Sequence, residues 1–96
     1  MTVYVDDIFE WPSDDWRNGQ WCHMWCDGDE AELHAVAARI GMKRSWFQSH
    51  DPRFHHYDLR PHKRELALEN GAHYMPLKQW IREGMSKRAP KKAPWK

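Results

Sequence analysis

The alternation of apolar and polar residues along the chain predicts four short strands and three helices. Residues 2–5 form a β-prone run, Thr-Val-Tyr-Val, that reads as a first strand. Residues 21–26 form a second run, in which the two cysteines and Met24 share the face better suited to a core. Between them, residues 8–20 hold proline, Asp-Asp and Asn-Gly turn formers, and we expect a loop there.

The clearest helical signal starts in the segment Asp-Gly-Asp-Glu at residues 27–30. Asp27 with Glu30, or Asp29 with Glu32, has the spacing of a capping box, and the acids suit the positive end of a helix dipole. Four apolar residues then follow at i, i+3, i+4 and i+7: Leu33, Val36, Ala37 and Ile40. This spacing predicts one buried stripe on a helix that ends at Gly41.

The remaining segments complete an alternating order of strands and helices. Pro61 and Pro76 suit the first turns of two further helices, and residues 55–57 and 72–75 are candidate short strands. The order predicts a small single-domain α/β fold. We expect a three- to four-stranded sheet, mixed or parallel, with about three helices.

Length and composition place the chain among small globular proteins. It has 96 residues and a mean hydropathy of −0.99, and no apolar stretch approaches the ~20 residues of a membrane span. With no signal peptide visible, we expect a cytoplasmic protein that does not enter a membrane. We expect residues 1–85 to form the domain and residues 86–96 a flexible basic tail.

The net charge of +1 hides a marked asymmetry between the two ends of the chain. Residues 1–32 carry nine acids and one base, whereas residues 33–96 carry five acids and fourteen bases. Such a distribution steers different partners to different surfaces. Seven tryptophans also exceed the needs of a small core. Trp11 and Trp16, which flank the turn formers at residues 12–15, are candidates for a lid or contact surface.

The two cysteines are expected to be free thiols. Four residues of extended chain separate the Cα atoms of Cys22 and Cys26 by ~13 Å, which is too far for a disulfide. Read with His23 as zinc ligands, they lack a second well-spaced pair. A structural zinc site is therefore disfavoured.

The dipeptide Asp6-Asp7 ends the first predicted strand, where open α/β sheets place groups that handle ligands. If the strands run parallel, loops at their carboxyl ends would also gather Asp27 and Asp58. Carboxylates are the ligands that Mg²⁺ or Mn²⁺ prefer. We therefore expect Asp6, Asp7 and Asp58 to hold a divalent ion.

Two histidines and one arginine extend this candidate site. An imidazole titrates near ~6.5, so His23 or His56 suits the role of a general base. The guanidinium of Arg64 presents a fork of donors that matches a phosphate. An ion beside these groups would polarise a phosphoryl or carbonyl oxygen and acidify a bound water.

Several segments resemble, in order and spacing, a family of small bacterial and phage proteins catalogued as a domain of unknown function. They are Val-Tyr-Val-Asp-Asp at 3–7, His-Met at 23–24, residues 32–41, Ser-Trp-Phe-Gln at 45–48, His-Tyr-Asp-Leu at 56–59 and residues 63–72. The resemblance implies that the polar residues of these segments are the ones to test. It adds Gln48 and Tyr57 to Arg64 as candidates for substrate binding. The link at residues 49–55 is longer than the family pattern, so His50 and His55 are less favoured.

Two functions remain open on this evidence. The leading interpretation is a cytosolic protein that handles a nucleotide or a small phosphorylated ligand, with a divalent-metal-dependent hydrolase as its most specific form. The alternative is a non-catalytic phage or bacterial accessory protein that binds a host protein or nucleic acid through tryptophan-rich and basic surfaces. Residues 78–96, with seven bases and one acid, suit phosphate contacts. A pocket of converging acids and histidines favours the first function, and an exposed tryptophan-rich surface favours the second.

Overall fold

A single long strand, β3, organises the sheet in the computed structural model, which describes residues 2–84. Two strands pair with one edge of β3, a third pairs with its other edge, and a fourth extends the sheet outward. The five strands of this mixed sheet are β1 (Val3–Val5), β2 (Phe9–Trp11), β3 (Gly19–Cys26), β4 (Tyr57–Leu59) and β5 (His73–Tyr74).

β1 and β2 run along the same edge of β3 with an irregular segment between them. Val5 pairs with Met24 and Phe9 pairs with Trp21, so three residues of the first segment stand opposite two residues of β3. One extra residue of this kind has the effect of a β-bulge, which bends the strand and re-aims its side chains. The segment at residues 6–8 therefore leaves the regular ladder at the place where the candidate carboxylates lie.

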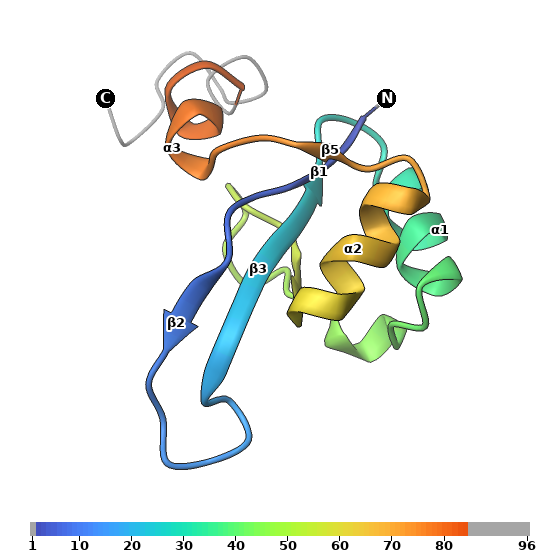
Figure 1. Ribbon diagram of the computed structural model, residues 1–96. Coiled ribbons are helices and arrows are strands. Elements are labelled where there is room, and N and C mark those ends of the chain that lie inside the picture. The colour runs from blue at the N-terminus through green and yellow to red at the C-terminus, as the bar shows by residue number, and fades with distance from the viewer. Residues whose placement is uncertain (1, 85–96) are drawn as a thin grey trace.

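Two helices, α1 (Glu30–Arg39) and α2 (Pro61–Glu69), cover one face of the sheet and close the core (Figure 1). α1 begins where the Asp29 carboxylate accepts a hydrogen bond from the Ala31 amide, and it ends before Gly41, whose φ of 83° suits glycine. The predicted stripe is confirmed as core, with Leu33, Val36, Ala37 and Ile40 all buried.

The opposite face of the sheet is covered at one end by the chain that follows β5. A short helix, α3 (Leu77–Gln79), continues into the π-helical turn Trp80–Gly84. Trp80 is buried there, with its ring centroid 5.3 Å from that of Tyr4 and 5.7 Å from that of Trp25. Ile81, which follows Trp80, is exposed.

The predicted α/β class is confirmed, with one strand more than expected. The prediction of a loop over residues 8–20 is wrong, because residues 9–11 form β2 and pair with the start of β3 as a hairpin (Figure 1). The expected gathering of Asp27 with the other acids is also wrong. β3 runs antiparallel to β1, so Asp27 lies beside the start of β1, where the Thr2 amide donates to its carboxylate.

No helix within residues 2–84 is long and apolar enough to cross a membrane. Both cysteines are free and buried, as predicted. The predicted basic tail at residues 86–96 lies outside the described residues.

Candidate functional site

Strand register brings three ligand-type side chains to one face of the sheet. His23 of β3 stands directly opposite Asp58 of β4 in the antiparallel ladder. His56 precedes Asp58 by two residues, so the period of an extended chain puts both on the same face. The intervening Tyr57 points the other way and is buried in the core.

Asp6 fixes the orientation of His23. One oxygen of the Asp6 carboxylate accepts from the backbone amide of His23 at 2.6 Å, and the other lies 2.7 Å from the Nδ1 atom of its ring. A carboxylate can only accept, so this contact places the proton of a neutral imidazole on Nδ1. The Nε2 atom of His23 is left with a lone pair. Asp6 is itself buried, at 4% exposure.

His56 is oriented in the same manner by a backbone carbonyl. Its Nδ1 atom lies 3.0 Å from the carbonyl oxygen of Phe54, which again can only accept, so Nε2 is left to face Asp58. That Nε2 atom is 3.4 Å from a carboxylate oxygen of Asp58. The rings of Phe54 and His56 also stack, with centroids 4.6 Å apart. The orientation of His56 is therefore held from two sides.

Asp58 and His56 influence each other electrostatically. Burial alone would raise the pKa of Asp58, but the contacts with His56, together with the hydrogen bond that the Gln48 amide donates, hold this pKa below its usual value. Burial alone would lower the pKa of His56, but hydrogen bonds to Asp58 and to the Phe54 carbonyl outweigh it and raise this pKa. Gln48 reaches the site because its backbone pairs with His56 as a β-bridge.

The three residues present one ligand atom each, and these atoms all lie within 4.8 Å of one another. Two imidazole nitrogens and one carboxylate oxygen form a donor set that binds divalent transition metals in proteins. We call His23, His56 and Asp58 the His-His-Asp cluster. Its geometry fits a metal ion.

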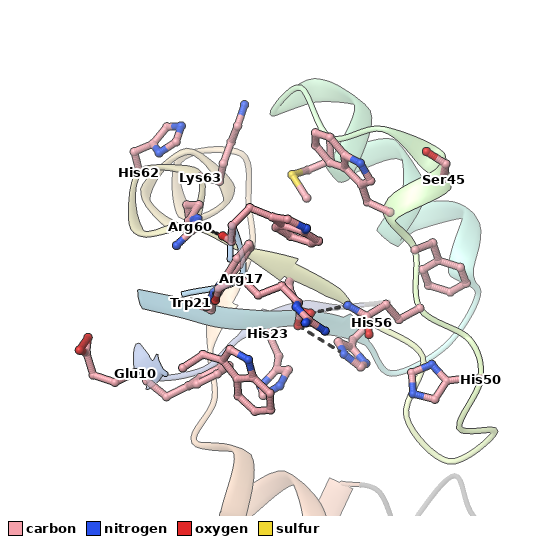
Figure 2. A pocket seen from close by; sticks show the side chains of 18 residues that line it. Glu10, Arg17, Trp21, His23, Ser45, His50, His56, Arg60, His62 and Lys63 are labelled. Atoms are coloured by element: carbon pink, nitrogen blue, oxygen red, sulfur yellow. Dashed lines mark hydrogen bonds and ion pairs between the residues drawn. The ribbon is translucent and has the colours of Figure 1, made fainter. Parts of the chain in front are cut away.

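The His-His-Asp cluster lies in the lining of an open cleft of about 1290 Å³. In Figure 2, His23 and His56 lie beside the sheet, His62 and Lys63 come from the start of α2, and Glu10 comes from β2. The 3₁₀ turn η1 (Arg44–Trp46) contributes a further wall. Four tryptophans also line the cleft: Trp11, Trp16, Trp21 and Trp46.

The β2–β3 hairpin forms one wall and is held in place by Arg60. The guanidinium of Arg60 donates to the carbonyl oxygens of Trp16 and Asn18 at 2.6 and 3.1 Å, and it stacks 3.8 Å from the ring centroid of Trp21. Gly19 makes this approach possible, since its φ is 122° and an added Cβ would lie 2.7 Å from Arg60. The hairpin wall is therefore held in place by contacts within the protein itself.

Comparison with known families assigns the chain to a family whose description names no activity. Residues 3–87 match the family described as "Protein of unknown function (DUF4031)". The chain belongs to this family. Membership agrees with the resemblance to a domain of unknown function seen in the sequence. No curated protein and no solved structure matches the chain.

Of the residues predicted to form the site, five come together. His23, His56 and Asp58 form the cluster, Asp6 contacts His23, and Gln48 contacts Asp58. This arrangement puts Asp6 behind an imidazole instead of beside an ion. The catalytic, metal-binding and substrate-binding roles expected from the sequence stay predictions.

The other three predicted residues lie away from the cluster. Asp7 points toward β5, where the Tyr74 hydroxyl donates to its carboxylate. The Tyr57 hydroxyl lies 2.8 Å from a ring nitrogen of His34, within the core side of the sheet. Arg64 donates to the backbone carbonyl of Asp6 at 2.9 Å and does not line the cleft.

Sequence reasoning missed the cleft residues on α2 and the role of the hairpin. Arg60 precedes Pro61, and Lys63 follows it by two residues; both line the cleft. A proline at the first helical position predicts where a helix starts, but it does not predict where the neighbouring side chains point. His50, less favoured from the family pattern, lines the cleft. His55 lies next to His56 but contacts Glu30, with 2.5 Å between ring nitrogen and carboxylate. Successive side chains of an extended chain point to opposite faces, and this rule alone could have predicted that His55 and His56 face different surroundings.

Proposed function

We propose that the protein is a divalent-metal-dependent hydrolase of phosphate esters, with the ion held by the His-His-Asp cluster. One observation carries the proposal: three ligand atoms converge within 4.8 Å, and each ligand side chain is oriented by a second group. Supporting contacts of this kind fix the tautomer and direction of metal ligands in proteins. Their presence on all three members supports a binding site over an ordinary surface ion pair.

The donor set indicates which ions the site favours. Mg²⁺ prefers oxygen ligands, whereas two imidazoles and one carboxylate suit Mn²⁺ or Zn²⁺. Three protein ligands leave a position for water or for a substrate oxygen. In this proposal the histidines bind the ion, and Asp6 positions His23.

The chemistry proposed for the cleft is hydrolysis of a phosphodiester. The ion would acidify a water and polarise the phosphoryl group. The water oxygen bonds to phosphorus as one ester P–O bond breaks, one water proton passes to the leaving oxygen, and the other is released to solvent. Lys63 supports an anionic substrate, because its ammonium donates one hydrogen bond, to the Ile40 carbonyl, and has two further donors.

Calorimetric titration with Mn²⁺ and Zn²⁺ tests the metal site. We expect one ion per chain, and we expect Asp58→Asn to abolish this binding because it removes the anionic ligand. Asp7→Asn is the matched control, since Asp7 is a neighbouring acid that contacts Tyr74 and not the cluster. Undiminished binding in Asp58→Asn, or loss of binding in Asp7→Asn, would contradict the assignment.

Hydrolysis of bis(p-nitrophenyl) phosphate tests the activity. Release of nitrophenolate should require the added ion, persist in Asp7→Asn and disappear in Asp58→Asn. Release that continues at an equal rate in Asp58→Asn would show that the cluster does not carry the reaction. Metal binding without any release would leave a metal site but overturn the hydrolase.

A further inference from the structure

The tryptophans of this small protein are distributed unevenly. Six lie within residues 2–84, and two of them, Trp25 and Trp80, are buried. Every tryptophan of that segment that is strongly exposed lines the one cleft already described: Trp11 at 51%, Trp16 at 74% and Trp46 at 48%. Exposed indoles gathered at one site are typical of binding surfaces, because they lose water contact when a ligand covers them.

Two of these indoles, Trp16 and Trp46, come from different walls, and each has a neighbouring side chain against its ring. Trp16 packs edge-on against Trp21, with centroids 6.2 Å apart, on the hairpin wall that Arg60 holds. Trp46 lies on the η1 wall, with the Lys43 ammonium 5.5 Å from its ring centroid. Flat aromatic surfaces that are fixed in advance lose little conformational entropy when a planar group stacks on them.

The lining supplies cations for the phosphates of a ligand. Arg60 and Lys63 line the cleft, whereas Arg17 is already paired with Asp15 at 2.7 Å, and the acids of the lining are Glu10 and Asp58. Aromatic side chains interleaved with cations are the pattern by which proteins bind single-stranded nucleic acid, with bases on the rings and phosphates beside the cations. In a duplex the bases already stack on one another and are not available to the indoles.

The size of the cleft argues for more than one nucleotide. Its volume of about 1290 Å³ exceeds the ~300–1,000 Å³ of pockets that enclose one small ligand. The exposed indoles line the same cleft as the His-His-Asp cluster, so an extended strand can contact them and pass the cluster with its backbone. That places a phosphodiester where the proposed hydrolysis needs it.

We infer that the cleft binds single-stranded nucleic acid, with bases stacked on Trp11, Trp16 and Trp46 and the backbone directed past the His-His-Asp cluster. The inference rests on the proposed function for cleavage, but the binding step needs no metal ion. Binding and cleavage can therefore be tested separately.

Fluorescence anisotropy of a labelled 12-mer of deoxythymidine, measured in EDTA, tests the binding step. We expect Trp11→Ala and Trp46→Ala each to weaken binding by about 5- to 150-fold, which is the loss of ~1–3 kcal/mol for one stacked base. Tyr74→Ala is the matched control, because Tyr74 is an exposed aromatic that does not line the cleft. Every variant keeps the full chain, so the basic residues at 86–96 are common to all.

Salt dependence and competition separate stacking from charge. Lys63→Gln should make the dependence of binding on salt shallower by roughly 0.7 in log K against log salt, the value for one phosphate contact on a single strand. A 12-base-pair duplex and poly-glutamate should compete weakly, because neither offers free bases. If either competes as well as the single strand, or if the tryptophan variants bind like Tyr74→Ala, the inference is wrong.

The Asp58→Asn variant distinguishes this inference from the proposed function. Its binding of the 12-mer in EDTA should be at least that of the wild type, since one acid has been neutralised. If the wild type binds the 12-mer but hydrolyses neither it nor bis(p-nitrophenyl) phosphate with Mn²⁺ or Zn²⁺, the hydrolase proposal fails and the binding inference stands. If it cleaves bis(p-nitrophenyl) phosphate but does not bind the 12-mer, the binding inference fails alone.

Discussion

The two faces of strand β3 differ in what covers them. On one face, Cys22, Met24 and Cys26 lie beneath α1 and α2 and are closed to solvent. On the other face, Trp25 is buried next to Trp80, while His23 remains partly open to the cleft. The same eight-residue strand thus builds a dry core on one side and a polar site on the other.

This difference follows from the number of elements that pack on each face. Both long helices cross the core face, whereas the chain after β5 covers the opposite face only at one end (Figure 1). A polar side chain on a fully covered face must find a partner or lose stability. The uncovered end is where imidazoles and carboxylates can face both one another and a ligand. Substitutions on the two faces should therefore have different consequences.

The largest effect should come from the core face. Met24→Ala should lower the free energy of unfolding by about 2–5 kcal/mol, because Met24 is fully buried and its truncation leaves a cavity. Urea denaturation followed by circular dichroism measures the change. Ile81→Ala, which shortens an exposed apolar side chain, is the control and should change stability by less than about 0.5 kcal/mol. Equal losses in the two variants would contradict the distinction between the faces.

The sequence predicts the core face well because burial there follows period and spacing. The alternation of Cys22, Met24 and Cys26, and the helical spacing from Leu33 to Ile40, are both signals within a single element. The hairpin was missed because its turn formers, which include Asn18-Gly19, also end strands. Only pairing with β3 shows that the residues before them are extended.

The site is less predictable, since it depends on register and direction between elements. The sequence pointed to the members of the cluster by residue type, but the opposition of His23 and Asp58 exists only in the antiparallel ladder of β3 and β4. The prediction for Asp27 was wrong because it needs β3 to run parallel to β1. The two strands are antiparallel, so Asp27 lies at the end of the sheet opposite to Asp6. The alternation of side chains along an extended chain is enough to predict that Asp6 and Asp7 point to opposite faces.

A smaller effect should come from Asp6, which supports the cleft face from beneath. Asp6→Asn should weaken binding of Mn²⁺ or Zn²⁺ by about 10- to 100-fold, because an amide cannot accept both hydrogen bonds from His23 and no longer fixes its tautomer. Calorimetric titration measures the affinity, with Asp7→Asn as the control. An unchanged affinity in Asp6→Asn would show that the carboxylate has no part in arranging the ligands.

The buried thiol of the core face should make stability depend on alkaline pH. Burial raises the pKa of Cys22 to about 12, above its ordinary 9.0. The protonated thiol is favoured in the folded state, so this contribution is complete below pH 9 and is lost as the pH rises from 9 toward 12. Between pH 8 and 10 the loss should be about 1 kcal/mol.

Urea denaturation of the wild type and of Cys22→Ala across that pH range isolates the thiol. The variant lacks the ionisable group, so its stability should fall less steeply above pH 9, whatever its stability at pH 7. Parallel curves for the two proteins would mean that another group controls the alkaline loss, such as Tyr57, whose pKa burial also raises.

The smallest change in stability should come from the tryptophans of the cleft. Trp11→Ala should alter the free energy of unfolding by no more than about 0.5 kcal/mol, because half of the Trp11 side chain is already exposed to water. This small effect is expected although tryptophan has the largest side chain of all residue types. Met24→Ala removes far fewer atoms and should cost several times more. A near-zero result beside weakened oligonucleotide binding would mean that the indole contributes to recognition and not to folding. A loss near that of Met24→Ala would instead show that the cleft wall is part of the core, and the contrast between the two faces of β3 would disappear.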